Sequence, residues 1–261
     1  MHRGLLKFLP VFFAIALGGG ALSQATASVL DWDLVDWTDT TAPYSQAFVV
    51  NGVTVTVSIT GDVNRFTTIN GDTAPDDNTH QTGGTGGESL YLAMNYTADT
   101  QAITITITFS AMVTNVSYSI FDIDFTNNGF TDQIRTISAT NGTTTYAASI
   151  TDSGAGNTVN IANNNTTSAT VTGDGTAAEG TDDGNATFAF GANNVNSITF
   201  TYGNDPATTP ADPSQQSIGL GDINFTIVPE PSTSFAAAFV VLAAGFHGWR
   251  RRSTFSAPSA A

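Results

Sequence analysis

Two segments of this chain place polar side chains at alternate positions. In one, Asp122 and Asp124 are separated by an isoleucine, and in the other the same spacing separates Asp222 and Asn224. Because alternate residues of a strand point the same way, each pair is predicted to share one face of a sheet. Hard oxygen ligands of this kind suit calcium, although solvated carboxylates on a strand face give the same pattern. The sequence therefore predicts a candidate calcium site formed by Asp122, Asp124, Asp132 and Asp222.

The sequence offers few other groups for catalysis. His80 is the one histidine between residues 28 and 227, and the chain has no cysteine. Zinc sites need several His or Cys ligands, and disulfides and thiol chemistry need cysteine, so these are excluded. Asp122 and Asp124 superficially resemble a glycosidase pair, but parallel carboxylates on one strand do not flank a substrate from two sides. We expect no enzymatic activity.

Basic residues are almost absent from the middle of the chain. Of the seven Lys and Arg residues, five lie in the first seven positions or at 250–252, which leaves Arg65 and Arg135. All 22 acidic residues lie between Asp31 and Glu230, so the formal charge there is −20 (2 − 22). This charge repels nucleic acid and anionic lipid and attracts divalent cations, and it also serves simply to keep a secreted protein soluble. We expect no nucleic-acid partner.

The middle of the chain has the pattern of β-strands. Apolar residues alternate with Thr or Ser over Val53–Ile59 and Ile103–Phe109, and Asn141-Gly142 is typical of a hairpin turn. We expect one all-β domain at 28–227, a two-sheet antiparallel β-sandwich of jelly-roll type. Further strands are expected at 48–50, 89–95, 113–125, 132–139, 143–150, 168–172, 186–190, 197–202 and 219–227, with long loops at 70–87 and 155–184.

Aromatic residues leave two functions open. Trp32 and Trp37 lie in the acidic segment Asp31–Asp39, which is predicted to form the first strand and to pack both indoles into the sandwich. Exposed aromatic faces would instead stack on sugar rings. The Asp-Ile-Asp segment and the closing Gly-Asp-Ile-Asn-Phe segment resemble a β-sandwich module of bacterial surface proteins and, more distantly, jelly-roll carbohydrate-binding modules. That resemblance implies the alternative function, a carbohydrate-binding module with or without calcium.

The beginning of the chain has the pattern of a secretory signal peptide. Basic residues precede an apolar run at 8–22, and the small residues Ala25 and Ala27 follow it. We expect signal peptidase to cut between Ala27 and Ser28 and so to remove residues 1–27.

The end of the chain combines three elements in a fixed order. Two prolines mark a stiff, extended linker, and an apolar run from Phe235 to Trp249 can enter a bilayer as a single transmembrane helix. A basic cluster would hold the end of that helix on the cytoplasmic side. The linker motif is Val228, Pro229, Glu230, Pro231 and Ser232, and the stop-transfer cluster is Arg250, Arg251 and Arg252.

This arrangement resembles the PEP-CTERM sorting signal of Gram-negative bacteria that make extracellular polysaccharide. The resemblance covers residues 228–252, and a tail at 253–261 departs from the usual pattern. It implies transient anchoring in the inner membrane, cleavage near Pro-Glu-Pro by an exosortase, and delivery to the envelope surface or the extracellular matrix. Exopolysaccharide or a biofilm would then be the setting in which the protein works. An ordinary single-pass membrane anchor is the alternative.

Overall fold

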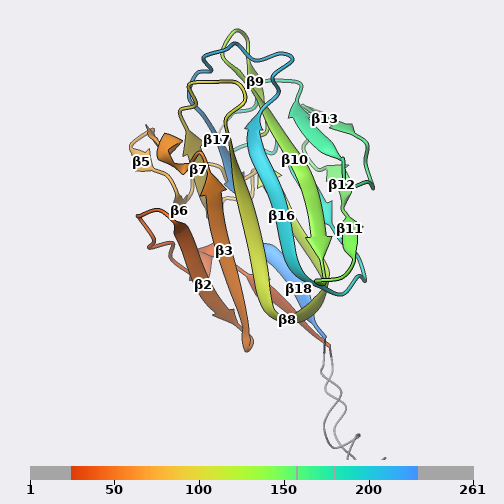
Figure 1. Ribbon diagram of the computed structural model, residues 1–261. Helices are drawn as coiled ribbons and strands as arrows, with labels where there is room; N and C mark the ends of the chain where they lie inside the picture. Colours follow the sequence, from red (N-terminus) through yellow and green to blue (C-terminus); the bar gives the residue numbers. More distant parts are fainter. Residues whose placement is uncertain (1–24, 157, 179, 229–261) are drawn as a thin grey trace, which may run out of the picture. The chain divides into compact units, whose positions relative to one another are not determined.

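The computed structural model describes residues 25–228, except 157 and 179, and Ala25–Val228 form a compact unit (Figure 1). No helix within the described residues is long and apolar enough to cross a membrane. Most of the predicted signal peptide, the sorting motif from Pro229 onward, the predicted transmembrane helix and the arginine cluster lie outside the described residues.

Strands make up nearly all the secondary structure of the described part. Two 3₁₀ helices, η1 (Trp32–Leu34) and η2 (Val63–Arg65), each have three residues. The strands are β1 (Thr26–Leu30), β2 (Tyr44–Val50), β3 (Val53–Gly61), β4 (Thr68–Ile69), β5 (Asp72–Thr73), β6 (Asp76–Asn78), β7 (Ser89–Met94), β8 (Ala102–Phe121), β9 (Phe125–Thr126), β10 (Phe130–Thr140), β11 (Thr145–Ala147), β12 (Ser149–Asp152), β13 (Val159–Ala162), β14 (Thr170–Gly173), β15 (Ala186–Ala189), β16 (Val195–Asn204), β17 (Gln216–Leu220) and β18 (Ile223–Ile227).

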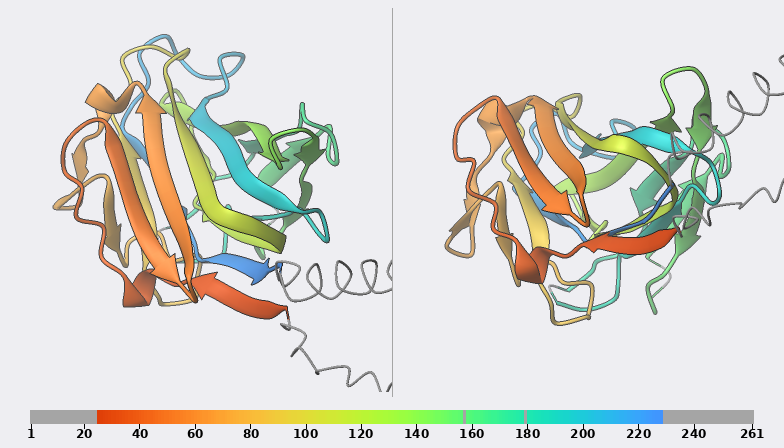
Figure 2. Two further views of the ribbon diagram at one scale, coloured as in Figure 1. Left: turned by 60° about the horizontal axis from the view of Figure 1, so that its bottom comes forward. Right: turned by 90° about the horizontal axis from the view of Figure 1, so that it is seen from below.

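The strand β8 connects two groups of strands. Its first half pairs with β3 on one edge and β16 on the other, and β10, β14 and β13 continue that layer. Its second half pairs with β15 on one edge and with β18 and β17 on the other. Figure 2 shows β8 curving from the first layer towards β18. The two predicted strands Ile103–Phe109 and Val113–Phe125 are therefore largely one strand of 20 residues.

The predicted all-β class is confirmed. All the strand pairings of the described residues are antiparallel, and hydrogen bonds join 16 strands into one large sheet, which is consistent with a β-sandwich. The period-2 pattern explains the core, since β3 buries Val53, Val55, Val57 and Ile59 and turns its Thr and Ser residues outward. The predicted hairpin at Asn141-Gly142 also forms, joining β10 to β11.

The segment that holds the two tryptophans is not a strand. Both indoles are buried as predicted, Trp32 fully and Trp37 with 5% of its surface exposed. The backbone, however, forms η1, because the Asp31 side chain accepts a hydrogen bond from the Asp33 N–H at 3.0 Å. Such a local bond satisfies a backbone donor that a strand would have offered to a neighbour. The predicted first strand at Asp31–Asp39 is therefore wrong, and the first strand within the described residues is β1.

Candidate functional site

The four carboxylates of the predicted calcium site do not come together. β8 ends at Phe121, and Asp122 adopts a left-handed backbone conformation with φ 62°, so Asp122 and Asp124 do not alternate along one strand. Asp222 lies between β17 and β18, where its Oδ1 accepts the backbone N–H of Trp32 at 3.1 Å. Among the described residues, no three His, Cys, Asp or Glu side chains gather closely enough to hold a metal ion. The same-face prediction for Asp122 and Asp124 is therefore wrong, whereas Asp222 and Asn224 do line one surface cleft together.

Asp124 and Asp132 do meet, but in the interior. The backbone N–H of Asp132 donates to the Asp124 carbonyl oxygen at 2.9 Å, and the Asp124 N–H donates to Asp132 Oδ2 at 3.3 Å. Asp132 is fully buried, and its Oδ1 accepts hydrogen bonds from the Tyr202 hydroxyl at 3.0 Å and from Gln216 Nε2 at 2.9 Å. These contacts make Asp132 the centre of a polar network inside the fold.

Burial governs the ionisation of both carboxyls. Desolvation raises the pKa of Asp132 well above its ordinary range, and the negative charges of Asp124 and Asp122 raise it further. Desolvation also raises the pKa of Asp124 to about 6, although the Ala177 N–H, which donates to Asp124 Oδ2 at 3.1 Å, acts in the opposite direction. Through this hydrogen bond, the Asp124 carboxylate fixes the loop that contains Ala177.

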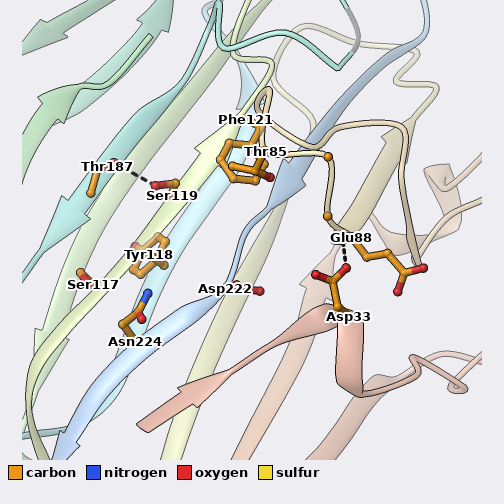
Figure 3. A pocket seen from close by; sticks show the side chains of 12 residues that line it. Asp33, Thr85, Glu88, Ser117, Tyr118, Ser119, Phe121, Thr187, Asp222 and Asn224 are labelled. Carbon is orange, nitrogen blue, oxygen red and sulfur yellow. Dashed lines mark hydrogen bonds between the residues drawn. The ribbon is translucent and has the colours of Figure 1, made fainter. Parts of the chain in front are cut away.

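A polar cleft of about 420 Å³ lies on the outer face of the second half of β8 (Figure 3). Residues of β8, β15 and β18 form its floor, while η1, the loop at 85–88 and the β17–β18 connection form its walls. The floor residues point outward because they alternate with core residues such as Tyr118, Phe188 and Phe225. The polar side chains of the floor are Ser117, Ser119, Thr187 and Asn224, and the carboxylates of the walls are Asp33, Glu88 and Asp222.

The floor of the cleft consists of small hydrogen-bonding groups held in strand register. Ser119 lies opposite Thr187 across the β8–β15 pair, and their hydroxyl oxygens are 2.8 Å apart. Ser117 lies opposite Asn224 across the β8–β18 pair. Hydroxyl and amide groups both donate and accept hydrogen bonds, so this floor can satisfy a ligand rich in hydroxyl groups.

The walls carry the carboxylates, two of which are fixed by backbone contacts. The Glu88 N–H donates to Asp33 Oδ1 at 2.6 Å, and Asp222 Oδ1 is occupied by the Trp32 N–H. A Cβ at Gly87 would lie 2.9 Å from Asp33 Oδ2, so any larger residue there would require the Asp33 carboxylate to shift. Figure 3 shows the carboxylates of Asp33 and Glu88 on the same side of the cleft.

The wall carboxylates have no basic partner among residues 25–228. The one ion pair within the described residues joins His80 Nε2 to Asp72 Oδ2 at 2.7 Å, and neither residue lines the cleft. Partial burial raises the pKa of Asp222, and the charges of Asp31 and Asp33 add to this effect. Desolvation likewise raises the pKa of Glu88, and the negative charges of Asp77 and Asp33 raise it further. Negative potential therefore accumulates at this end of the cleft.

Aromatic faces are not exposed in the cleft. Tyr118 is buried and stacks on Phe188 and Phe200, with ring centroids 5.2 and 5.5 Å away. Phe121 is 9% exposed, and its ring packs so closely on Gly221 that a Cβ there would lie 2.6 Å from Phe121 Cζ. Both tryptophans and four of the tyrosines belong to the interior, namely Trp32, Trp37, Tyr91, Tyr96, Tyr118 and Tyr202. Tyr44 and Tyr146 are half-buried, and neither lines the cleft.

The predicted processing sites mark the two ends of the folded unit. Ala27 and Ser28 lie in β1, where they pair with Thr226 and Phe225 of β18. Ala25 and Ala27 are exposed, and Ser28 is the first buried residue of the strand. At the other end, the Val228 N–H donates to the Met112 carbonyl oxygen at 3.3 Å.

The cleft could not be found from residue spacing. Asp33 and Glu88 are 55 positions apart, and Asp222 lies far from both in sequence. The serines and threonines of the floor have the same alternation as every other outward strand face. The Gly-Gly pair before Glu88 was the one local indication of a close backbone approach.

Comparisons of this chain with protein-family models, curated proteins and solved structures found no significant match. The role of the protein must therefore be inferred from its own residues and geometry.

Proposed function

We propose that this protein is exported and works without catalysis at the cell surface or in the extracellular matrix, where a PEP-CTERM tail and an exosortase deliver it. The boundaries of the folded unit carry this proposal. The unit begins at Ala25, three residues before the expected mature start at Ser28 (28 − 25), and ends at Val228, the first residue of the sorting motif. Both expected cuts thus fall at the edge of the fold.

Cleavage after Ala27 is compatible with a stable mature protein. It would remove the exposed residues at the start of β1 and keep Ser28 and Leu30, which are buried. The remaining strand would still pair with Ile223–Phe225 of β18. The expected route runs from signal peptidase through transient inner-membrane anchoring to the exosortase, and exopolysaccharide is the partner that this route favours.

A jelly-roll-like sandwich is the finer architecture that we propose for the unit. Short antiparallel strands and the shared strand β8 favour a two-layer arrangement of this kind. A non-catalytic role is favoured by the cleft lining, in which no His, Lys or Arg is present among the described residues. Within the described residues, the hydrogen-bond partner of the Ser119 hydroxyl is the Thr187 hydroxyl and not a general base that would activate it.

Carbohydrate binding is the second candidate function, and the cleft favours it. Its volume of about 420 Å³ lies within the range of about 300–1,000 Å³ typical of small-molecule sites. The Ser, Thr and Asn groups of its floor match the hydroxyl groups of a sugar. On this proposal, the cleft attaches the exported protein to the surrounding polysaccharide.

The export proposal can be tested by expressing the full chain in a bacterium that has an exosortase and in the same strain without it. Mass spectrometry should give a mature N-terminus at Ser28 in both strains. The residues that follow the Pro-Glu-Pro motif should be lost only in the strain that has the exosortase. A Glu230→Ala variant should keep its C-terminal segment and stay in the inner membrane, whereas Glu88→Ala should be processed normally. Retention of the C-terminal segment by the unmutated protein, with the exosortase present, would contradict the proposal.

A further inference from the structure

We infer that the cleft binds a positively charged saccharide, namely one whose sugar units carry free amino groups. This inference rests on the carbohydrate-binding function proposed above and specifies its ligand class. A cationic sugar offers hydroxyl groups to the floor at Ser117, Ser119 and Thr187. It also offers ammonium groups to the wall at Asp33, Glu88 and Asp222.

The charge of the site favours a cation. No basic side chain lines the cleft, and Arg65 and Arg135 are the only Lys or Arg residues between 25 and 228. One oxygen of Asp33 and one of Asp222 bind backbone N–H groups, but within the described part of the chain no donor reaches their second oxygens or the Glu88 carboxylate. These oxygens are available to a ligand, and a polysaccharide of acidic sugars would be repelled by them.

The geometry argues against a single metal ion as that cation. Asp33, Glu88 and Asp222 line one cleft, yet they do not form a group of three close enough to hold an ion, and no such group exists elsewhere in the described residues. Carboxylates that line one side of a cleft without closing around an ion suit a larger ligand that brings ammonium groups to that side. An amino-sugar oligomer can do so while its hydroxyl groups face the floor.

The absence of an exposed aromatic face in the cleft strengthens the case for charge. Neutral sugars are commonly held by stacking on aromatic rings, but Tyr118 and Phe121 are packed into the fold. Hydrogen bonds between neutral groups add little net affinity, because they replace bonds to water. Ammonium–carboxylate hydrogen bonds are roughly twice as strong as neutral ones, so a charged amino group would supply the affinity that stacking does not.

Two other hollows on the described surface serve as comparisons for the cleft. The hollow lined by Leu34 and Val49 has one hydroxyl side chain, Ser28, and one carboxylate, Asp31, so it lacks the row of hydroxyl groups and the several acids of the cleft. The hollow lined by Asp174 and Asp205 contains threonines and asparagines and has about 360 Å³, so it resembles the cleft in chemistry. It therefore provides a matched control for attraction by acidity alone.

The experiment measures binding by calorimetry with the full chain in detergent micelles, so its outcome does not depend on export or processing. The probes are a glucosamine tetramer, the fully N-acetylated tetramer, a uronic-acid tetramer and tetralysine. The variants are Glu88→Gln, Asp33→Asn with Glu88→Gln, and the control Asp174→Asn with Asp205→Asn. The glucosamine tetramer should bind saturably, and Glu88→Gln should weaken it about tenfold, which corresponds to the loss of one charge-assisted contact.

Each outcome decides the inference. Saturable binding of the glucosamine tetramer that the cleft variants weaken and the Asp174/Asp205 control leaves unchanged supports it. Equal binding of the acetylated tetramer would overturn the requirement for charge while leaving carbohydrate binding intact. Tighter binding of tetralysine, or an equal loss in the control variant, would show general attraction by an acidic surface and overturn the site. Binding of none of the sugars would overturn carbohydrate binding itself, and export would still stand on its own test.

Discussion

The backbone N–H of Trp32 donates to Asp222 Oδ1 at 3.1 Å across 190 residues of sequence. The Trp32 indole N–H donates to the neighbouring Gly221 carbonyl oxygen at the same distance, and its ring meets Phe48 edge-on at 5.6 Å. One tryptophan therefore fixes η1 to the β17–β18 connection, and these two segments carry Asp33 and Asp222 into the wall of the cleft.

Replacing Trp32 by Phe should lower stability and disturb the cleft together. The change removes the hydrogen bond to Gly221 and part of a fully buried side chain, which together cost roughly 1–3 kcal/mol of unfolding free energy. Because η1 would lose an anchor, binding of the glucosamine tetramer should also weaken. Denaturant unfolding and calorimetry check the two effects.

Trp37→Phe is the matched control for this prediction. Trp37 is 5% exposed and its indole N–H donates to the Asp39 carbonyl oxygen at 2.8 Å, but Trp37 does not line the cleft. A comparable loss of stability with unchanged sugar binding is expected. Equal weakening of binding in both variants would show that the effect is global.

Stability should rise on mild acidification, and Asp124 should contribute to the rise. Its pKa is about 6 in the folded protein, against an ordinary value of 3.8. Between these values the folded state binds more protons than the unfolded state, so its stability falls as pH increases. The full shift corresponds to about 3 kcal/mol at most, and the raised pKa of Asp132 acts in the same direction.

Thermal melting at pH 7.5 and pH 5 tests this sign. The melting temperature of the unmutated protein should be higher at the lower pH, and Asp124→Asn, which can still accept the Ala177 N–H, should show a smaller difference. An identical pH dependence in both proteins would remove Asp124 as a contributor.

Two buried tyrosines should respond differently to loss of the hydroxyl group. Tyr202 donates to Asp132 at 3.0 Å and accepts from Gln216 Nε2 at 3.3 Å, so Tyr202→Phe should cost about 1–3 kcal/mol. The Tyr118 hydroxyl is buried without a hydrogen-bond partner among the described residues, so Tyr118→Phe should be neutral or stabilising. Urea unfolding of both variants measures the contrast, and equal losses would contradict the assigned network.

Alanine substitutions at two glycines of the loop before β7 should distinguish the cost of a steric clash from the cost of an unfavourable backbone conformation. Gly83 and Gly86 both have positive φ, 59° and 76°, which disfavours any L side chain. A Cβ at Gly83 would collide with the Phe121 ring, whereas a Cβ at Gly86 would meet nothing within 4 Å. Gly86→Ala should therefore cost about 1–2 kcal/mol and Gly83→Ala clearly more. Chemical denaturation tests the order, and a reversed order would refute the packing at Phe121.

Local alternation predicted the strands well where one face is buried. Val53–Ile59 and Ile103–Phe109 lie within β3 and β8, and the Asn-Gly pair at 141 forms its hairpin. Alternation failed where a side chain bonded its own backbone, as at Asp31, or where the chain turned left-handed, as at Asp122. Neither the side chain–backbone bond at Asp31 nor the left-handed turn at Asp122 changes the pattern of apolar residues in the sequence. Strand β13, inside the predicted loop at 155–184, was also missed because its Val and Ile residues are surrounded by polar residues.

The carboxylates show a further limit of sequence patterns. Asp132 was expected in a cation site, but the fold buries it beside Tyr202 and Gln216, which lie 70 and 84 positions away. Asp33 and Glu88 carried no pattern at all and nevertheless meet across 55 positions. Long-range strand order decides such encounters, and residue spacing does not contain it.

The pairing of β1 with β18 sets an order of events for a chain that is made from its N-terminus. Within residues 25–228, β1 pairs with β18 alone, with Ser28 opposite Phe225 and Leu30 opposite Ile223, so β1 has no strand partner until β18 has been synthesised. Contacts of such large sequence separation close slowly. In a nascent chain of this topology, β1 would therefore stay unpaired until β18 arrives, even while β2, β3 and β8 can already pair with one another.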